Sequence, residues 1–163
     1  MIVCAIADDL EIGVDVEDVT REAPLDVATH YFAPIEVANL RSVAPREQAK
    51  RFFDVWTLKE SYIKARGLGL TIPLDRFAVA LGDVSETPRS IAITIDPAWD
   101  DDGAWWQLAQ HRPSDQHVIS LCARRRYLQL DVSITWHDYA TAMSDVYSAL
   151  SDPQSSRHHN YWS

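Results

Sequence analysis

The stretch Trp56-Thr-Leu-Lys-Glu-Ser-Tyr-Ile-Lys64 lies in the longest helical pattern of the chain, which begins at Pro45 and ends near Arg66. Apolar residues recur along it at spacings of three and four, a pattern typical of one buried helix face. Gly67 follows the last helical position, where glycine commonly ends a helix. We therefore predict a long, largely buried helix over residues 45–66.

Glu60 interrupts the apolar stripe of this helix, and an ionised carboxylate on a buried face is costly unless it is paired or binds a metal. Lys64 lies one turn further on the same side, so one interpretation is an i,i+4 ion pair. Such a pair contributes only about 0.2–0.5 kcal/mol on an exposed helix, too little to explain burial. The apolar members of the stripe are Ala49, Phe52, Phe53, Trp56 and Ile63.

Upstream, Ile12-Gly-Val-Asp-Val-Glu17 alternates with a period of two, which predicts a strand. Asp15 and Glu17 leave the same face of this strand, roughly 7 Å apart. The opposite face, formed by Ile12, Val14 and Val16, is aliphatic, and we expect it to face the core.

The three acids Asp15, Glu17 and Glu60, with Lys59 and Lys64 near the last of them, fit two arrangements. In one, hard oxygen ligands hold Mg²⁺ together with a phosphate substrate, and the lysines neutralise the remaining phosphate charge. In the other, the same residues form a structural ion-pair cluster without a ligand. The residues alone leave both interpretations open.

The other patterns indicate an α+β fold in which an antiparallel sheet packs on the long buried helix. We expect one domain over residues 1–150 and a flexible tail over 151–163, with a fully buried first strand over residues 1–7 that forms a hairpin with residues 12–17. Further helices are predicted over residues 25–32, 35–43 and 138–150, and further strands over 77–81, 91–95, 105–109, 118–123 and 128–136.

Composition excludes several classes. The 163 residues are 47% apolar and 24% charged, which is average for a globular domain. A net charge of -9 makes the chain a poor general binder of nucleic acid. The apolar opening is too short to span a membrane and lacks a basic leader, so we expect no membrane association. Cys4 and Cys122 lie in apolar runs and are expected to be buried free thiols, which fits a cytoplasmic location.

The two acidic stretches also resemble the two signature motifs of the 4′-phosphopantetheinyl transferases, which read roughly G-[IV]-D-[IV]-E and W-x-x-K-E-[AS]-x-x-K. They stand in the family's order, about forty residues apart. Gly67-Leu-Gly-Leu70 and Pro73-Leu-Asp-Arg-Phe77 are similar to segments of the larger, surfactin-synthetase-associated class. The resemblance extends over about residues 1–137.

The resemblance implies Mg²⁺-dependent transfer of 4′-phosphopantetheine from coenzyme A to a serine of an acyl or peptidyl carrier protein, a holo-[acyl-carrier-protein] synthase activity. It assigns Asp15, Glu17 and Glu60 as Mg²⁺ ligands, and Lys59 and Lys64 as contacts of the coenzyme A phosphates. Glu60 is also the implied candidate for deprotonating the carrier serine, and Lys64 for assisting the leaving group.

The chain departs from the family in one respect. The larger class has two similar halves with the coenzyme A site between them, and Met1-Ile-Val-Cys-Ala5 resembles the strand that follows the first half. The short holo-acyl-carrier-protein synthases instead share sites between subunits. We therefore expect a homo-oligomer or a partner that supplies the missing half. The alternative is a truncated, non-catalytic remnant that serves as a carrier-protein or subunit interaction module.

Overall fold

Helix α3 (Pro45–Arg66) is the central element of the computed structural model, which describes residues 1–82 and 90–138. Its bounds are those predicted. Pro45 occupies the first turn, where its missing N–H costs no helical hydrogen bond. Gly67 ends the helix with φ 64°, in the left-handed region that glycine adopts without a steric penalty.

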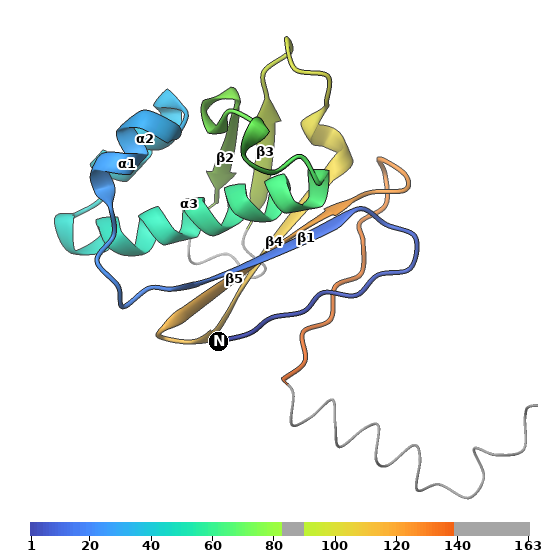
Figure 1. Ribbon diagram of the computed structural model, residues 1–163, viewed down its shortest axis with the longest axis horizontal. Coiled ribbons are helices and arrows are strands. Elements are labelled where there is room, and N and C mark those ends of the chain that lie inside the picture. Colours follow the sequence, from blue (N-terminus) through green and yellow to red (C-terminus); the bar gives the residue numbers. More distant parts are fainter. Residues whose placement is uncertain (83–89, 139–163) are drawn as a thin grey trace, which may run out of the picture. The chain divides into compact units, whose positions relative to one another are not determined.

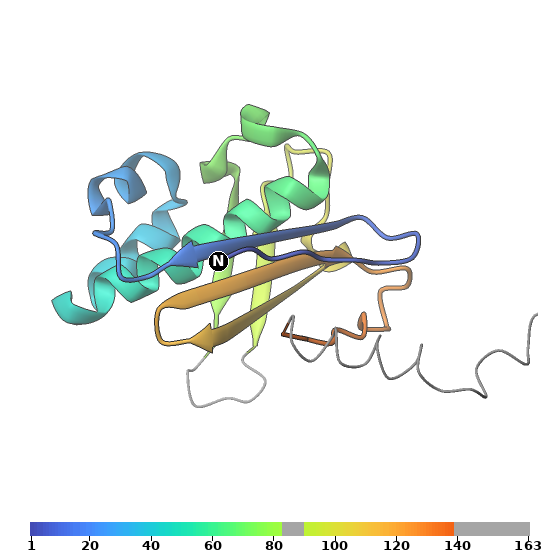
Figure 2. The same ribbon diagram turned by 60° about the horizontal axis from the view of Figure 1, so that its bottom comes forward.

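Strands β1 (Ile12–Asp18), β4 (Trp106–Ser114) and β5 (His117–Arg124) form an antiparallel sheet in the order β1-β5-β4. Figures 1 and 2 show α3 lying across one face of this sheet. Because β5 is the middle strand, β1 is an edge strand that pairs with β5 alone. The predicted α+β arrangement of a sheet packed on a long helix is confirmed.

Two smaller groups of elements flank α3. Strands β2 (Phe77–Leu81) and β3 (Ile91–Ile95) pair antiparallel as a second sheet, with the bounds predicted. Helices α1 (Leu25–Tyr31) and α2 (Pro34–Ser42) contact α3 and lie above its N-terminal part in Figure 1. Single 3-10 turns complete the order at Gly69–Thr71, Leu74–Arg76 and Gly103–Trp105.

The two faces of β1 are buried in the opposite sense to the one expected. Gly13 and Asp15 are the buried positions, whereas Ile12, Val14 and Val16 are only half-buried. The reason is that α3 covers the acidic face: a Cβ on Gly13 would collide with the backbone of Ser61 and Ala65. The strand therefore presents its carboxylates, not its aliphatic side chains, to the helix.

Residues 1–7 do not form the buried strand that was predicted. They double back alongside β1 as a hairpin arm would (Figures 1 and 2), but they lie outside every described strand. Ile2 and Ile6 are 97% and 93% exposed. An apolar strand of this kind needs cover on both faces, which the described part of the chain does not supply. Cys4 is accordingly an exposed thiol, and only Cys122 is buried as expected.

Residues 128–136 do not form a strand either. The side-chain amide of Gln107 on β4 makes both hydrogen bonds to the backbone of Val132, with the Val132 N–H at 2.6 Å and the Val132 carbonyl at 2.9 Å. The side chain of Gln107 thus makes the hydrogen bonds to this segment that a neighbouring strand's backbone would make in a sheet. Residues 139–150 of the helix predicted over 138–150, and the tail over 151–163, lie outside the described residues.

The chain divides into two units with the boundary after Val132. The predicted end of a domain at residue 150 stays a prediction. No helix in the described ranges combines the length and the apolar character that crossing a membrane requires.

Candidate active site

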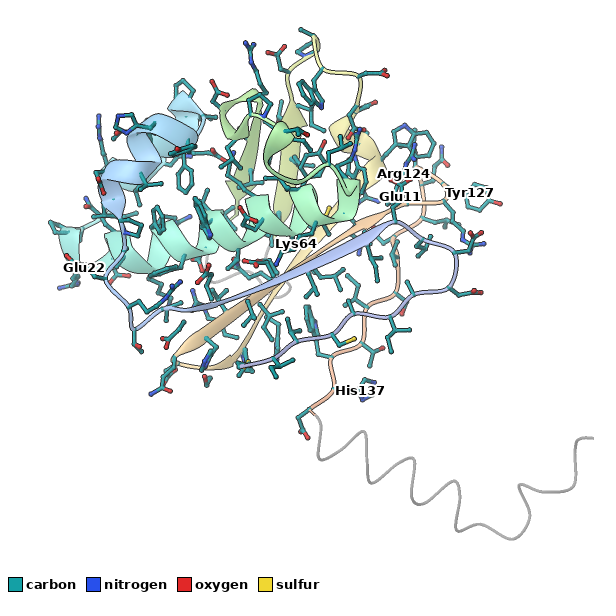
Figure 3. The ribbon with its side chains drawn as sticks, viewed as in Figure 1. Glu11, Glu22, Lys64, Arg124, Tyr127 and His137 are labelled. Carbon is teal, nitrogen blue, oxygen red and sulfur yellow. The ribbon has the colours of Figure 1, made fainter. Side chains whose placement is uncertain are left out.

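Lys64 of α3 reaches across to β1, as Figure 3 shows. Its Nζ donates to Asp15 Oδ1 at 2.7 Å, and the Asp15 side chain is 10% exposed while that of Lys64 is 49% exposed. In the described ranges, Lys64 is therefore paired with the strand and not with Glu60, so the i,i+4 interpretation of this lysine is wrong. The pairing brings the two signature stretches together.

Glu60 stands one turn before Lys64 and is half-buried. Burial raises the pKa of the Glu60 carboxyl above its ordinary value, and the negative charge of Asp15 raises it further. Lys64 opposes this shift and Glu17 adds to it. Both acids of β1 thus raise the pKa of Glu60, so the three carboxylates are close enough to interact electrostatically.

Glu17 forms an ion pair with Arg21, whose guanidinium lies 5.5 Å from the centre of the Phe53 ring. Burial raises the pKa of the Glu17 carboxyl above its ordinary value, Arg21 opposes the shift and Asp15 adds to it. Sequence reasoning missed Arg21, although a cation four residues after an acidic motif was visible there as a potential partner.

The second oxygen of Asp15, Oδ2, is buried and has no hydrogen-bond partner among the described residues. Such an atom is costly in water-excluded surroundings, and a hard cation would satisfy it. The donor chemistry of the three carboxylates therefore fits Mg²⁺. As the side chains stand, residues 1–82 and 90–138 contain no group of three or more metal-ligating side chains arranged to hold an ion. The convergence of Asp15, Glu17 and Glu60 on one ion stays a prediction.

Lys59 does not lie at this site. Its side chain is fully buried, and its Nζ donates to both carboxylate oxygens of Glu36 on α2, at 3.0 and 2.7 Å. Burial lowers the pKa of the Lys59 ammonium below its ordinary value, while Glu36 opposes that shift. An ammonium enclosed in this way has no access to a phosphate. We therefore correct the expectation that Lys59 contacts coenzyme A.

A buried polar ladder holds α3 on the sheet beneath the site. Ser120 Oγ of β5 donates to Thr57 Oγ1 at 2.8 Å, and Gln110 Nε2 of β4 donates to Ser120 Oγ at 3.1 Å. At the far end of α3, the Asp101 carboxylate accepts from Tyr62 OH at 2.6 Å and also binds Arg66. Sequence reasoning missed these anchors because each joins residues far apart in the chain.

An open hollow elsewhere on the molecule is lined by Trp105 and three consecutive arginines. Arg124 is paired with Glu11 at 2.5 Å, as Figure 3 illustrates, and Arg125 with Asp131 at 3.0 Å. Arg126 lies 3.9 Å from a carboxylate oxygen of Asp9. These cations already have acidic partners, so we place the candidate site between β1 and α3 and not here.

Curated proteins similar to the chain carry the name of one enzyme class. A "4′-phosphopantetheinyl transferase" of Bacillus subtilis is 42% identical over 122 residues, which cover 75% of this chain and 50% of that protein. The "4′-phosphopantetheinyl transferase Sfp" of Bacillus subtilis strain 168 is 40% identical over 93 residues, covering 55% of this chain and 41% of that protein. The chain thus spans about half the length of the curated relatives it matches.

The fold agrees with these sequences. The crystal structure of the Thermotoga maritima holo-[acyl-carrier-protein] synthase superposes with a TM-score of 0.54 at 16% identity, over 72% of this chain and 65% of that one. The sequence model of the 4′-phosphopantetheinyl transferase superfamily matches residues 11–122, which include both signature stretches and most of β5. The chain therefore belongs to the 4′-phosphopantetheinyl transferase superfamily.

Proposed function

We propose that this chain catalyses the transfer of 4′-phosphopantetheine from coenzyme A to a serine of an acyl or peptidyl carrier protein. The observation that carries the proposal is the placement of Glu60 and Lys64 of α3 against Asp15 of β1 in a member of this superfamily. Curated relatives named as 4′-phosphopantetheinyl transferases support the same activity.

Asp15, Glu17 and Glu60 are the residues proposed to hold Mg²⁺. The unpartnered Asp15 Oδ2 and the mutual repulsion of the carboxylates support this assignment. When bound, the ion supplies positive charge that neutralises the pyrophosphate of coenzyme A. Lys64 and Arg21, which pair with Asp15 and Glu17, would supply further positive charge for the anionic groups of coenzyme A.

In the proposed reaction the serine oxygen attacks the phosphorus that carries the pantetheine arm. A serine O–P bond forms, the P–O bond to the nucleotide phosphate breaks, and adenosine 3′,5′-bisphosphate leaves. Glu60 accepts the serine proton, directly or through water, as a general base. The Lys64 ammonium stabilises the negative charge that grows on the leaving phosphate.

We further propose that a second protein surface completes the site, either from another copy of the chain or from a partner that supplies the other half. The exposed N-terminal residues support this assembly. Ile2 and Ile6 are almost fully exposed beside the edge strand β1, and exposed apolar surface of this kind marks interaction sites. A non-catalytic remnant is not favoured, because the acids of both signature stretches are retained.

Both cysteines are free thiols, which supports the cytoplasm as the proposed compartment.

Calorimetric titration of coenzyme A, with and without Mg²⁺, tests whether the chain binds coenzyme A and the metal as proposed. We expect Mg²⁺ to tighten binding in the wild type, but not in Glu60→Gln. The matched control is Glu47→Gln, which changes an exposed acid in the first turn of the same helix. An affinity for coenzyme A that is the same with and without Mg²⁺ in all three proteins would contradict the metal assignment.

A further inference from the structure

Glu36 and Lys59 form the most deeply enclosed ion pair of the described chain: both side chains are 0% exposed. Lys59 Nζ donates to the two oxygens of Glu36 and, at 2.6 Å, to the carbonyl of Phe77. It also lies 4.1 Å from the centre of the Phe77 ring, so that a cation–π contact completes its surroundings. All three donor directions of the ammonium are thereby used.

Glu36 accepts from the backbone as well. Its Oε2 accepts the N–H of Ala33 at 2.8 Å, and its Oε1 accepts the N–H of Val79 at 2.7 Å. One carboxylate therefore joins the start of α2, the second sheet through β2, and α3. Figure 1 shows α2 above α3 and β1 below it, so the pair holds α3 from the side opposite the candidate site.

Stability alone does not explain such a pair, because a hydrophobic pair of similar volume is often equally stable in a protein core. The ion pair differs from an apolar contact because its hydrogen bonds fix the orientation of the two side chains. Helix α3 is buried around most of its circumference, and apolar contacts are non-directional, so they tolerate a rotated helix. With 3.6 residues per turn, a slip of one position swings each side chain by about 100°.

We infer that Glu36 is a positioning residue: by fixing Lys59, it sets the rotation of α3 that presents Glu60 and Lys64 to Asp15. Lys59 immediately precedes Glu60, so the rotation that encloses one side chain determines where the next one points. On the sheet side, the Thr57–Ser120 hydrogen bond fixes a second point of the same helix. The Asp101 contacts of Tyr62 and Arg66 hold the C-terminal turns of the helix as well, so the Glu36–Lys59 pair is the anchor on the α2 side. This inference rests on the proposed function of the site.

The test compares wild type with Glu36→Gln and with the double variant Glu36→Gln/Lys59→Met, which leaves no unpaired buried charge. Two quantities are measured at a temperature where near-UV circular dichroism shows each protein to be folded. One is the affinity for Mn²⁺ as a spectroscopic probe of the Asp15/Glu17/Glu60 site. The other is the nuclear Overhauser effect between the Gly13 α-protons and the Ala65 amide, which reports how α3 sits on β1.

We expect both variants to bind Mn²⁺ about tenfold more weakly, the lower end of the range for residues that support metal ligands indirectly. The Gly13–Ala65 signal weakens in parallel. Leu108→Ala is the control, because it removes buried apolar atoms from β4 and lowers stability without changing Mn²⁺ affinity. Wild-type affinity and an unchanged signal in the folded double variant overturn the inference. Absence of Mn²⁺ binding in the wild type contradicts the proposed metal site instead, and the Gly13–Ala65 signal still decides the positioning role.

Discussion

Lys64 Nζ lies 2.7 Å from Asp15 Oδ1, so the two signature stretches of the chain meet through an ion pair between α3 and β1. The residues are 49 positions apart in the sequence. The contact exists because Gly13, two residues before Asp15, lets the helix backbone approach the strand closely. A local glycine therefore determines a long-range contact at the candidate site.

Replacing this lysine separates a catalytic role from a structural one. Lys64→Met should lower turnover by roughly a hundred- to a thousandfold, because one electrostatic contact to developing charge typically contributes that much. Because Asp15 is buried while Lys64 is half-exposed, losing the pair should lower the free energy of unfolding by about 1–3 kcal/mol. Thermal melts and single-turnover transfer assays measure the two effects. Lys50→Met, which changes an exposed lysine of the same helix, should alter neither. Near-normal transfer by Lys64→Met would show that the lysine is structural.

Gly13→Ala tests the close approach of α3 to β1. The added Cβ collides with the backbone of Ser61 and Ala65, so the helix must move away from the strand. We expect a loss of about 1–3 kcal/mol in the free energy of unfolding, together with weaker metal binding. Gly67→Ala is the contrast: it strains a left-handed residue that has open space around it, so it should cost stability and leave metal affinity unchanged. Equal metal affinity in both variants would refute the role given to Gly13.

The raised pKa values of Glu17 and Glu60 predict how stability depends on pH. From about pH 4.3, the ordinary pKa of glutamate, up to the folded-state pKa, the folded protein binds more protons than the unfolded one. Its free energy of unfolding due to these groups therefore falls as the pH rises through that window.

Added Mg²⁺ should reverse this trend, since metal ligands must be ionised and binding to the folded state stabilises it. Melting temperatures measured against pH, with and without Mg²⁺, check the prediction. The difference between wild type and Glu60→Gln isolates the contribution of Glu60. If that difference has no pH dependence in this window, the electrostatic account of the site is wrong.

The exposed apolar N-terminal residues predict association. We expect sedimentation of the wild type to give a mass above that of the monomer, or to do so once the partner is added. Ile2→Lys/Ile6→Lys should abolish the complex, because two buried lysines without partners oppose it. Ile35→Lys changes an exposed isoleucine on α2 and should not. A wild type that stays monomeric at high concentration, and that is active alone, would contradict the shared-site proposal.

Local sequence signals predicted the bounds of helices and strands well where those bounds depend only on neighbouring residues. Pro45 and Gly67 fixed both ends of α3, and β2 and β3 have the predicted bounds. Burial was predicted less well, because it depends on which layer covers a face. The acidic side of β1 faces α3, and the aliphatic side does not. Residues 1–7 are exposed for the same reason: their composition calls for cover that the described chain does not provide.

The candidate site shows the same division. Motif spacing predicted that Asp15, Glu60 and Lys64 serve one site, and the structure places Lys64 in contact with Asp15. For Lys59, the sequence predicted a phosphate contact and not the buried partner that the structure shows. That partner, Glu36, is 23 residues away and is visible in the sequence only as a capping residue at the start of α2. Long-range pairing of single charges leaves no periodic pattern from which it could be predicted.

The most direct test of the central proposal is the intact mass of an apo carrier protein after incubation with this chain, coenzyme A and Mg²⁺. We predict that the carrier gains the mass of one phosphopantetheine on its serine. We also predict that the gain disappears with a chelator or with Glu60→Gln, and persists with Glu47→Gln. A carrier that stays unmodified, while the folded wild-type chain binds coenzyme A and is supplied with its partner, would contradict the assignment of this chain as a phosphopantetheinyl transferase.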